Sequence, residues 1–364
     1  SYNYYYFPTD IGHIISSQWK KYGFNISRLS FQLKNITIPS SVTLIEDNIF
    51  TDCLSFTKII IPSSVKFIGD YAFSGCSSLT EITIPSSVTS IAKYAFEKCY
   101  SLKKISIPSS VLSIGNHSLS ECSSLTQILI PSSVNFIYDF AFNECSSLTE
   151  ITIPSSVKSI GEGLFADCSS LKQVSILLSI TSIKKSLFEG CSSLTQFTIP
   201  PSVTLIEENA FRYCSSLTEI IIPSSVTSIE ENAFRDCSSL TKIIIPSSVT
   251  LIEKNAFRDC SSLIEISIPS SIVSIKDNVF SGCKSLKHVS IPSSVTLIGN
   301  SSFYECSSLE QMSIPSSVTA IGCCAFFGCS KMTRISIPSS VSSIGSDSFH
   351  GCFSLTNINL PLSI

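Results

Sequence analysis

The sequence predicts a repeat solenoid, built mainly of β-strands, in which a 23-residue unit is copied about fourteen times. Fourteen of the sixteen prolines share one register, in which Leu177 fills the single position that lacks a proline. Fourteen cysteines recur with the same period, and a phenylalanine stands three residues before nearly all of them, Leu119 being the exception. Because unrelated residue types share one period over about 320 residues without an insertion, the repeat decides the fold.

Residues 79–101 illustrate how one unit is expected to fold. Ile82 and Ile84 alternate with polar residues, which is typical of a short strand with one buried face. Pro85 has no backbone N–H to donate, so it ends the strand, and the two serines after it turn the chain. A single unit has too few inward positions to form a core, so stacked copies must bury one another. The other inward positions are Leu79, Val88, Ile91, Ala95, Phe96 and Cys99.

The consensus L-x-x-I-x-I-P-x-x-V-x-x-I-x-x-x-A-F-x-x-C-x-x resembles the leucine-rich repeat of the BspA-like type over residues 33–364. The resemblance implies a curved, horseshoe-like solenoid with a parallel sheet of about 15 strands along its concave side. Leucine-rich repeats commonly carry an asparagine ladder after the strand, whereas this chain has Pro-Ser-Ser there. We therefore expect serine hydroxyls to bond the backbone of the turn. The Val-x-x-Ile segment on the convex side fits either a second short strand or extended coil.

The two ends of the chain differ from the repeats. Residues 1–32 are rich in aromatic side chains and are predicted to form an N-terminal cap, with a helix from Asp10 to Tyr22. Residues 33–364 form the predicted solenoid. The sequence stops at Ile364, part-way through a unit and without a clear cap. Since an open end exposes core and strand edge, either a tail is missing or a second copy covers the end in a homodimer.

Composition argues against two classes of partner. The net charge of −3 and the pI near 5.9 do not fit the basic surface of a nucleic-acid-binding protein. Mean hydropathy is +0.36, but the apolar runs are short and periodic and none approaches the roughly 18 residues of a membrane-spanning helix. The first residues lack the features of a secretory signal, but since the chain begins at Ser1 its natural start is expected to have been trimmed away, and the lack says little about location. Localisation is left open between cytoplasm and cell surface.

The fourteen periodic cysteines are predicted to form an unpaired, buried ladder. Neighbouring side chains in such a column point the same way, which is poor geometry for a disulfide, and a line of single cysteines does not cluster ligands around a metal. Free thiols are more typical of proteins in a reducing compartment than of secreted proteins, although burial would protect them from oxidation outside the cell. Cys323 and Cys324 stand outside the column and are expected near the surface, as tolerated loop substitutions or as sites of oxidation or an intermolecular bridge.

No enzyme signature is present, so the chain is predicted to be non-enzymatic, with no cofactor and no metal. None of the phosphate-binding, zinc-protease or serine-hydrolase motifs occurs, and the four histidines lack ligand spacing. Serine is abundant, but Ser-Ser recurs in almost every unit, which marks it as turn chemistry.

Specific function is expected where the copies disagree, in the outward columns of the predicted sheet. Ile221 and Ile244 interrupt a column of small polar residues and should form an exposed apolar pair, which often marks a protein contact. Opposite charges alternate along the neighbouring column, so a self-neutralised soluble sheet is the competing interpretation. The candidate partner-binding residues are Glu219, Ile221, Lys242, Ile244, Glu265, His288, Gln311 and Arg334.

A second charged ladder crosses three consecutive units. It consists of acidic residues at 207, 208, 230, 231 and 253, followed by Arg212, Arg235 and Arg258. These arginines are expected to compensate the acidic surface; the alternative is a site for a basic partner.

These features together predict recognition of a protein partner by the surface of the solenoid. BspA-like proteins are associated with adhesion at the cell surface, so the resemblance implies that role. The alternative is an intracellular scaffold or regulator of a signalling enzyme such as a phosphatase, which the free thiols favour. Carbohydrate binding would call for aromatic side chains on the concave column, and the sequence places none there.

Overall fold

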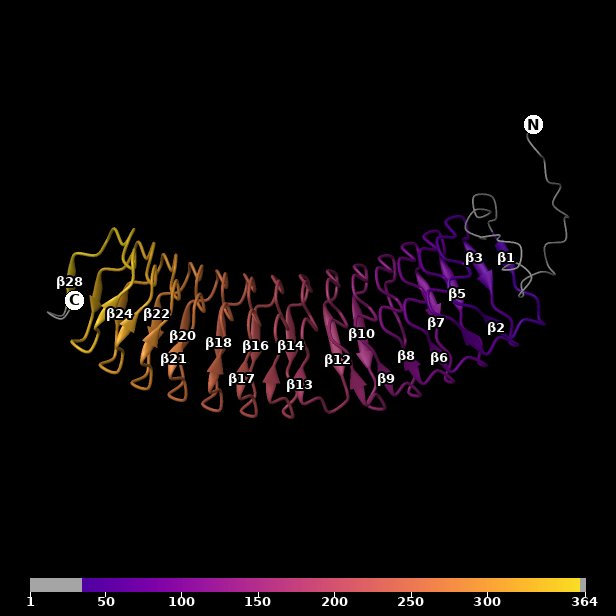
Figure 1. Ribbon diagram of the computed structural model, residues 1–364, viewed down its shortest axis with the longest axis horizontal. Helices are drawn as coiled ribbons and strands as arrows, with labels where there is room; N and C mark the ends of the chain where they lie inside the picture. The colour runs from indigo at the N-terminus through magenta and orange to yellow at the C-terminus, as the bar shows by residue number, and fades with distance from the viewer. Residues whose placement is uncertain (1–34, 361–364) are drawn as a thin grey trace, which may run out of the picture. The chain divides into compact units, whose positions relative to one another are not determined.

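The computed structural model describes residues 35–360, and in that part the chain is a parallel β-solenoid with no helix (Figure 1). Nearly every 23-residue turn contributes two strands, one to each of two rows. The predicted N-terminal cap, with its helix from Asp10 to Tyr22, lies outside the described residues. Residues 361–364, at the end that a second copy is predicted to cover, lie outside them too, so the homodimer stays a prediction.

The first row contains strands of three or four residues, at the positions where the alternating isoleucines predict them. Fourteen of the fifteen expected positions form strands, and the ladder is interrupted at residues 127–129. These long strands are β1 (Asn35–Thr37), β3 (Lys58–Ile60), β5 (Glu81–Thr83), β7 (Lys104–Ser106), β10 (Glu150–Ile153), β12 (Gln173–Ile176), β14 (Gln196–Thr198), β16 (Glu219–Ile221), β18 (Lys242–Ile244), β20 (Glu265–Ser267), β22 (His288–Ser290), β24 (Gln311–Ser313), β26 (Arg334–Ser336) and β28 (Asn357–Asn359).

The second row resolves the alternative left open for the Val-x-x-Ile segment, because a strand of two residues forms there in every described turn. These short strands are β2 (Leu44–Ile45), β4 (Phe67–Ile68), β6 (Ser90–Ile91), β8 (Ser113–Ile114), β9 (Phe136–Ile137), β11 (Ser159–Ile160), β13 (Ser182–Ile183), β15 (Leu205–Ile206), β17 (Ser228–Ile229), β19 (Leu251–Ile252), β21 (Ser274–Ile275), β23 (Leu297–Ile298), β25 (Ala320–Ile321) and β27 (Ser343–Ile344).

The chain divides into two compact units near the one repeat in which Leu177 replaces proline. The first unit extends to Leu164 and includes Ser175–Leu178; within it the long strands pair in the order β1-β3-β5-β7 and the short strands as β2-β4 and β11-β9-β8-β6. The second comprises Phe165–Val174 and the chain from Ser179 onward, with long-strand sheets β14-β16-β18-β20-β22 and β24-β26-β28. Its short strands pair as β13-β15-β17-β19 and β21-β23-β25-β27. Within each of these sheets the pairing is parallel, with partners one repeat apart.

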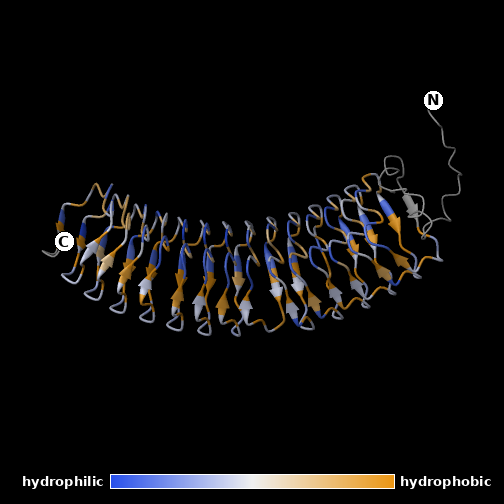
Figure 2. Cartoon of the chain, in the orientation of Figure 1, coloured by the Kyte–Doolittle hydropathy of each residue, from blue (hydrophilic) through white to orange (hydrophobic). Residues whose placement is uncertain are grey.

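The core of each turn consists of the inward columns that the period predicts. Hydrophobic residues recur at the same positions from turn to turn (Figure 2). The phenylalanine column forms a stack of nearly parallel rings, with centroids 5.4 Å apart for Phe73 and Phe96 and 5.5 Å for Phe234 and Phe257. The rings of the column from Phe50 to Phe326 are fully buried, and Phe349 is partly buried. Replacing one such ring with alanine would cost about 3–5 kcal/mol of stability.

The serine turn confirms the expectation that hydroxyls replace the asparagine ladder. The second serine of the Pro-Ser-Ser turn donates to a main-chain carbonyl of the preceding turn: Ser225 Oγ lies 2.6 Å from the Val203 oxygen, and Ser294 Oγ lies 2.7 Å from that of Ile272. The turn itself closes through the N–H of Val226, 3.0 Å from the carbonyl of Pro223. A bond from side chain to neighbouring turn thus holds successive copies in register.

The cysteine column is a ladder of free thiols, as predicted. Thirteen of the sixteen cysteines are buried and all sixteen are free. Twelve of the ladder thiols donate to a carbonyl of the preceding turn, as Cys237 Sγ does to Phe211 at 3.1 Å and Cys99 Sγ to Phe73 at 3.3 Å. Cysteine therefore serves as a small apolar residue that also satisfies a buried carbonyl, which explains its place beside phenylalanine.

Candidate partner-binding surface

The long-strand face, meaning the outward first and third residues of the long strands, carries the candidate residues. In the second unit Ile221 pairs in register with Ile244, and Glu219 with Lys242. The intervening Ile220 points into the core, so alternation along the strand forces its neighbours outward. Ile221 and Ile244 are 72% and 67% exposed, and they form the adjacent apolar pair that the sequence predicts.

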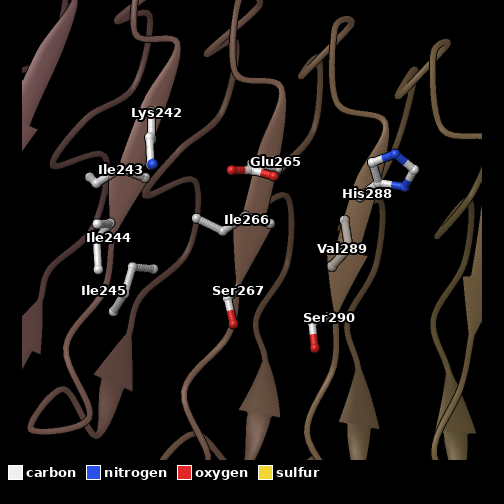
Figure 3. A pocket seen from close by; sticks show the side chains of 10 residues that line it. All are labelled: Lys242, Ile243, Ile244, Ile245, Glu265, Ile266, Ser267, His288, Val289 and Ser290. Carbon is white, nitrogen blue, oxygen red and sulfur yellow. The ribbon is translucent and has the colours of Figure 1, made fainter.

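A shallow hollow of about 460 Å³ lies beside this pair, over strands β18, β20 and β22 (Figure 3). Its upper rim in the figure is the row of Lys242, Glu265 and His288. Along the parallel third-residue row the side chain shrinks from isoleucine at 244 to serine at 267 and 290, and this step in size leaves the hollow. Its lining residues are Lys242, Ile243, Ile244, Ile245, Glu265, Ile266, Ser267, His288, Val289 and Ser290.

The charges at the hollow are not engaged with each other. Lys242 stands opposite Glu265 on the neighbouring strand, yet no ion pair joins them among the described residues. In the first unit Lys58 and Glu81 occupy the same column on neighbouring strands and pair at 2.7 Å. Hydrogen bonding from Lys58 holds the pKa of the Glu81 carboxyl below its usual value. Lys242 and Glu265 thus keep their bonding capacity for a group from outside the chain.

The structure brings six of the eight candidate residues into one sheet. Glu219 and Ile221 lie on β16, Lys242 and Ile244 on β18, and the series continues through β20 to β22, because Glu265 pairs in register with His288. The remaining two lie in a separate three-stranded sheet of the same unit, where Gln311 pairs with Arg334. Ile264, which precedes the lining residue Glu265 in the chain, is also exposed and was not among the predicted residues.

The short-strand face of the first unit holds an apolar surface that sequence reasoning missed. Leu44 pairs with Phe67 in register and both are exposed. Leu112, Phe136 and Tyr138 are exposed farther along the same unit, with the rings of Phe136 and Tyr138 6.4 Å apart. The signal was available at Leu112, which interrupts a column occupied mostly by threonine, and at Leu44, Phe67 and Phe136, whose column has serine at half of its positions. Its meaning depended on knowing that the Val-x-x-Ile segment forms a second sheet.

Two aromatic stacks at the surface also went unpredicted. Tyr71, Tyr94, His117 and Phe140 stack in successive turns with centroids 4.5, 4.7 and 4.9 Å apart. All four have left-handed backbones, at φ between 51° and 57°. Partial burial in the stack lowers the pKa of His117. The second stack consists of Tyr304, Phe327 and His350. Because the rings cover one another's faces, they present edges rather than a flat platform to solvent.

The arginine ladder has partners other than those predicted. Arg212 pairs with Glu189 at 3.4 Å, and Arg235 with Asp236 at 3.2 Å. Arg258 pairs with Asp259 at 3.2 Å. The acidic residues of the neighbouring turns are instead met by lysines, as Glu207 is by Lys184, Glu208 by Lys185 and Glu253 by Lys276. Lysines thus compensate three of the five acidic residues, whereas Glu230 and Glu231 form no ion pair among the described residues. The predicted compensation by the arginines is wrong, because each arginine pairs with another carboxylate in its own or the preceding turn.

The thiols outside and inside the ladder differ in character. Cys323 is exposed and Cys324 partly so, as their departure from the column predicts. Burial raises the pKa of Cys99 to about 12, and that of Cys145 to about 12, so the ladder thiols stay protonated and unreactive near neutral pH. Between residues 35 and 360 no group of three or more His, Cys, Asp or Glu side chains is placed to hold a metal ion.

Comparison with known proteins agrees with this geometry. The family described as BspA type leucine rich repeat region (6 copies) matches residues 23–149, 135–264 and 252–364. No match was found among curated proteins. Within the described residues there is no helix of the length and apolarity required to cross a membrane.

Several solved bacterial structures are similar to the chain. A leucine-rich repeat protein from Bacteroides ovatus is 34% identical over 82% of this chain and 83% of its own, with a TM-score of 0.69. A leucine rich cell surface protein from Faecalibacterium prausnitzii is 31% identical over 90% of this chain and 87% of its own, with a TM-score of 0.56. A leucine-rich repeat protein from Eubacterium ventriosum shares the fold at 23% identity, covering 79% and 86% of the two chains, with a TM-score of 0.58.

Proposed function

The chain belongs to the BspA-type leucine-rich-repeat family, and from that premise we propose that it binds a protein partner through the long-strand face of its second unit. The observation that carries the proposal is the hollow between β18 and β22, where Lys242 and Glu265 face solvent without pairing beside an exposed isoleucine pair. Apolar side chains rimmed by polar and charged groups are the usual anatomy of a protein contact.

The chemistry of the hollow favours a protein segment over other ligands. Glu219, Lys242 and Glu265 alternate in sign across three strands, so a polyanion would meet two carboxylates for each lysine. Polypeptide supplies cations, anions and apolar side chains together. The site is open and shallow, which suits an extended segment lying across the strands, with an apolar side chain against Ile221 and Ile244. Gln311 and Arg334 would extend the contact into the next sheet of the unit.

We place this recognition at the cell surface, as adhesion to host or matrix proteins. The F. prausnitzii protein, which is 31% identical to this chain, is described as a cell surface protein. The intracellular scaffold was favoured by the free thiols, but thirteen of the cysteines are buried, where air or oxidants do not reach them readily. The thiol ladder is therefore compatible with an oxidising exterior, and no observation in the described residues favours the scaffold.

The test of location is labelling of intact cells of the native source with a membrane-impermeant biotin reagent. Labelling without permeabilisation supports the adhesion role. If the protein is labelled only after permeabilisation, while a known surface protein is labelled throughout, adhesion is excluded and the scaffold takes its place.

The test of the site uses the purified full chain against immobilised extracellular-matrix proteins and intact epithelial cells. The double variant Ile221→Ser, Ile244→Ser should weaken saturable binding about tenfold, because the apolar contact is lost. Its thermal stability should not fall, since both side chains are exposed. The matched control is Ile60→Ser, which removes an isoleucine that is 57% exposed in the same column of the first unit. Binding that survives the double variant, or falls equally with the control, rules the site out.

A further inference from the structure

Two buried serines do not serve the fold. In one inward column, from residue 49 to residue 348, alanine occupies seven of fourteen positions and serine three. The serine hydroxyl at 348 donates to the carbonyl of Gly322 at 2.9 Å. Ser118 and Ser302 are fully buried, and neither hydroxyl has a hydrogen-bond partner among the described residues. A buried hydroxyl without a partner loses its bonds to water, so alanine would suit these two positions better.

Each of these two serines stands two residues after an asparagine. The asparagines belong to another column, from residue 47 to residue 346, in which asparagine occurs at only two of fourteen positions, 116 and 300. Both therefore coincide with a serine that the fold leaves unbonded. The resulting segments, Asn116-His117-Ser118 and Asn300-Ser301-Ser302, are acceptor sequences for N-linked glycosylation. The third serine of the column, Ser348, is preceded by Ser346 and lacks this pattern.

The fold does not require asparagine in its column either. Asn300 Oδ1 accepts the N–H of Cys323 in the next turn at 2.8 Å. Asp277 Oδ1 accepts the N–H of Asn300 in the same way at 2.8 Å, so a carboxylate performs the same task. What asparagine adds is the Nδ2 amide. The Asn300 side chain is exposed and that of Asn116 is partly so, and Nδ2 has no partner at either position among the described residues.

We propose that Asn116 and Asn300 carry N-linked oligosaccharides. The transfer forms a bond between Nδ2 and the anomeric carbon of the first sugar of a polyprenyl-diphosphate-linked oligosaccharide. The bond from that carbon to the diphosphate oxygen breaks, the polyprenyl diphosphate leaves with the electron pair, and Nδ2 gives up one proton to solvent water. An oligosaccharyltransferase, the enzyme class that uses this donor, reads the hydroxyl two residues after the asparagine. Recognition by this enzyme gives the hydroxyls of Ser118 and Ser302 a function, which the fold does not give them.

The backbone conformation at the two sites indicates whether the glycan is transferred before or after the chain folds. In the folded protein His117 and Ser301 both have φ of 51°, and the serine that follows each is buried. An enzyme that reads an extended segment cannot engage either site after folding, so transfer precedes folding and the hydroxyl is buried afterwards. The glycans then stand on the turns that follow β8 and β23, not on the long-strand face.

The direct experiment uses protein isolated from its native source. Digestion with an N-glycosidase in ¹⁸O-labelled water converts a glycosylated asparagine to labelled aspartate, and mass spectrometry of the peptides reports each site. Labelled aspartate at 116 and 300 is expected. Recovery of both peptides with intact asparagine, before and after digestion, overturns the proposal.

The second experiment tests the physical argument on full-length protein made without glycans in bacteria. Ser118→Ala and Ser302→Ala should each raise the midpoint of thermal unfolding by about 1–2 °C, because an unbonded buried hydroxyl is removed. The matched control, Ser348→Ala, should lower it, because this hydroxyl is bonded. If the first two variants are destabilised like the control, the serines serve the fold and the reason for the proposal is gone.

Discussion

Lys58 and Glu81 in the first unit lie on neighbouring strands in the same column as Lys242 and Glu265 in the second. The first pair meets at 2.7 Å and the second does not meet. Both pairs have the same register, so the difference comes from the surroundings. Glu81 has a second lysine, Lys104, on its other side, which adds to the positive potential there.

The comparison teaches that matching columns do not make matching surfaces. An exposed ion pair gains little over hydration, so leaving Lys242 and Glu265 apart costs the fold little. The apolar neighbours differ as well: Ile60 stands alone in its part of the column, whereas Ile221 lies beside Ile244. The first unit therefore carries an ion pair on this face at the positions where the second carries an unpaired lysine and glutamate beside two exposed isoleucines.

The largest expected effect concerns what the two regions share, the buried thiol column. Burial raises the pKa of Cys99 and of Cys145 from 9.0 to about 12. Below pH 9 such a thiol is protonated in both the folded and the unfolded chain, so it does not reduce stability. Above pH 9 the thiol ionises only in the unfolded chain, so stability falls as the pH rises toward 12. Each such thiol costs roughly 1.4 kcal/mol for each pH unit above 9. Urea unfolding followed at increasing pH should show a steep, cooperative loss of stability.

Both units should lose stability over the same pH range, because the column runs through both. The control is a Cys323→Ser, Cys324→Ser variant, which should keep the alkaline profile of the parent since these thiols lie outside the column. A free energy of unfolding that stays flat between pH 9 and 11 would contradict the account of the ladder as neutral, buried thiols.

The next largest effect is a loss of partner binding, which is expected for a variant in the second unit and not for the matched variant in the first. Lys242→Ala should weaken binding of the matrix protein or cell probe by about threefold to tenfold, because the partner loses a charged hydrogen bond. Lys58→Ala, the matched change in the first unit, should leave binding unchanged. Surface plasmon resonance with both variants measures the contrast. Equal losses would show that the whole long-strand face, rather than its second unit, contacts the partner.

The smallest expected effect is a change in the pKa of one carboxyl group, that of Glu81. Lys58 lowers the pKa of Glu81, so Lys58→Ala should raise that pKa toward its ordinary value, with Lys104 retaining part of the shift. NMR titration of the Glu81 side chain reports the change. The control is Lys242→Ala, which should not move it. An unchanged Glu81 pKa in the Lys58 variant would mean that the ion pair does not persist in solution.

Much of the fold could be predicted from the sequence because nearly every repeat places the same residue types at the same positions. The alternation of isoleucines around positions such as Ile82 predicts the long strands, and proline predicts where they end. The cysteine column could be predicted as unpaired from the parallel direction of its side chains. The serine hydroxyls could be expected to bond the backbone because they stand in the turn where leucine-rich repeats commonly carry asparagine, and Ser225 does bond the carbonyl of Val203.

The candidate site was less accessible to sequence reasoning. The isoleucine pair at 221 and 244 could be placed because alternation along a strand assigns every side chain to a face. The hollow beside it could not, since it depends on the volumes of side chains in three adjacent turns. The arginine partners were predicted wrongly because Arg235 pairs with the adjacent Asp236 and not with the acidic residues at 230 and 231. The position of a residue in a column does not show which neighbouring group its side chain reaches.

By itself the sequence determined the period, the inward columns and the residues available to each outward column, because a 23-residue frame without insertions leaves one way to bury the apolar positions. Tertiary structure alone decided which outward groups satisfy one another. Whether Lys58 meets Glu81 while Lys242 remains apart from Glu265, or whether a buried hydroxyl at 302 finds a carbonyl, depends on distances of a few tenths of a nanometre between turns. Those distances are set by packing, which no single repeat encodes.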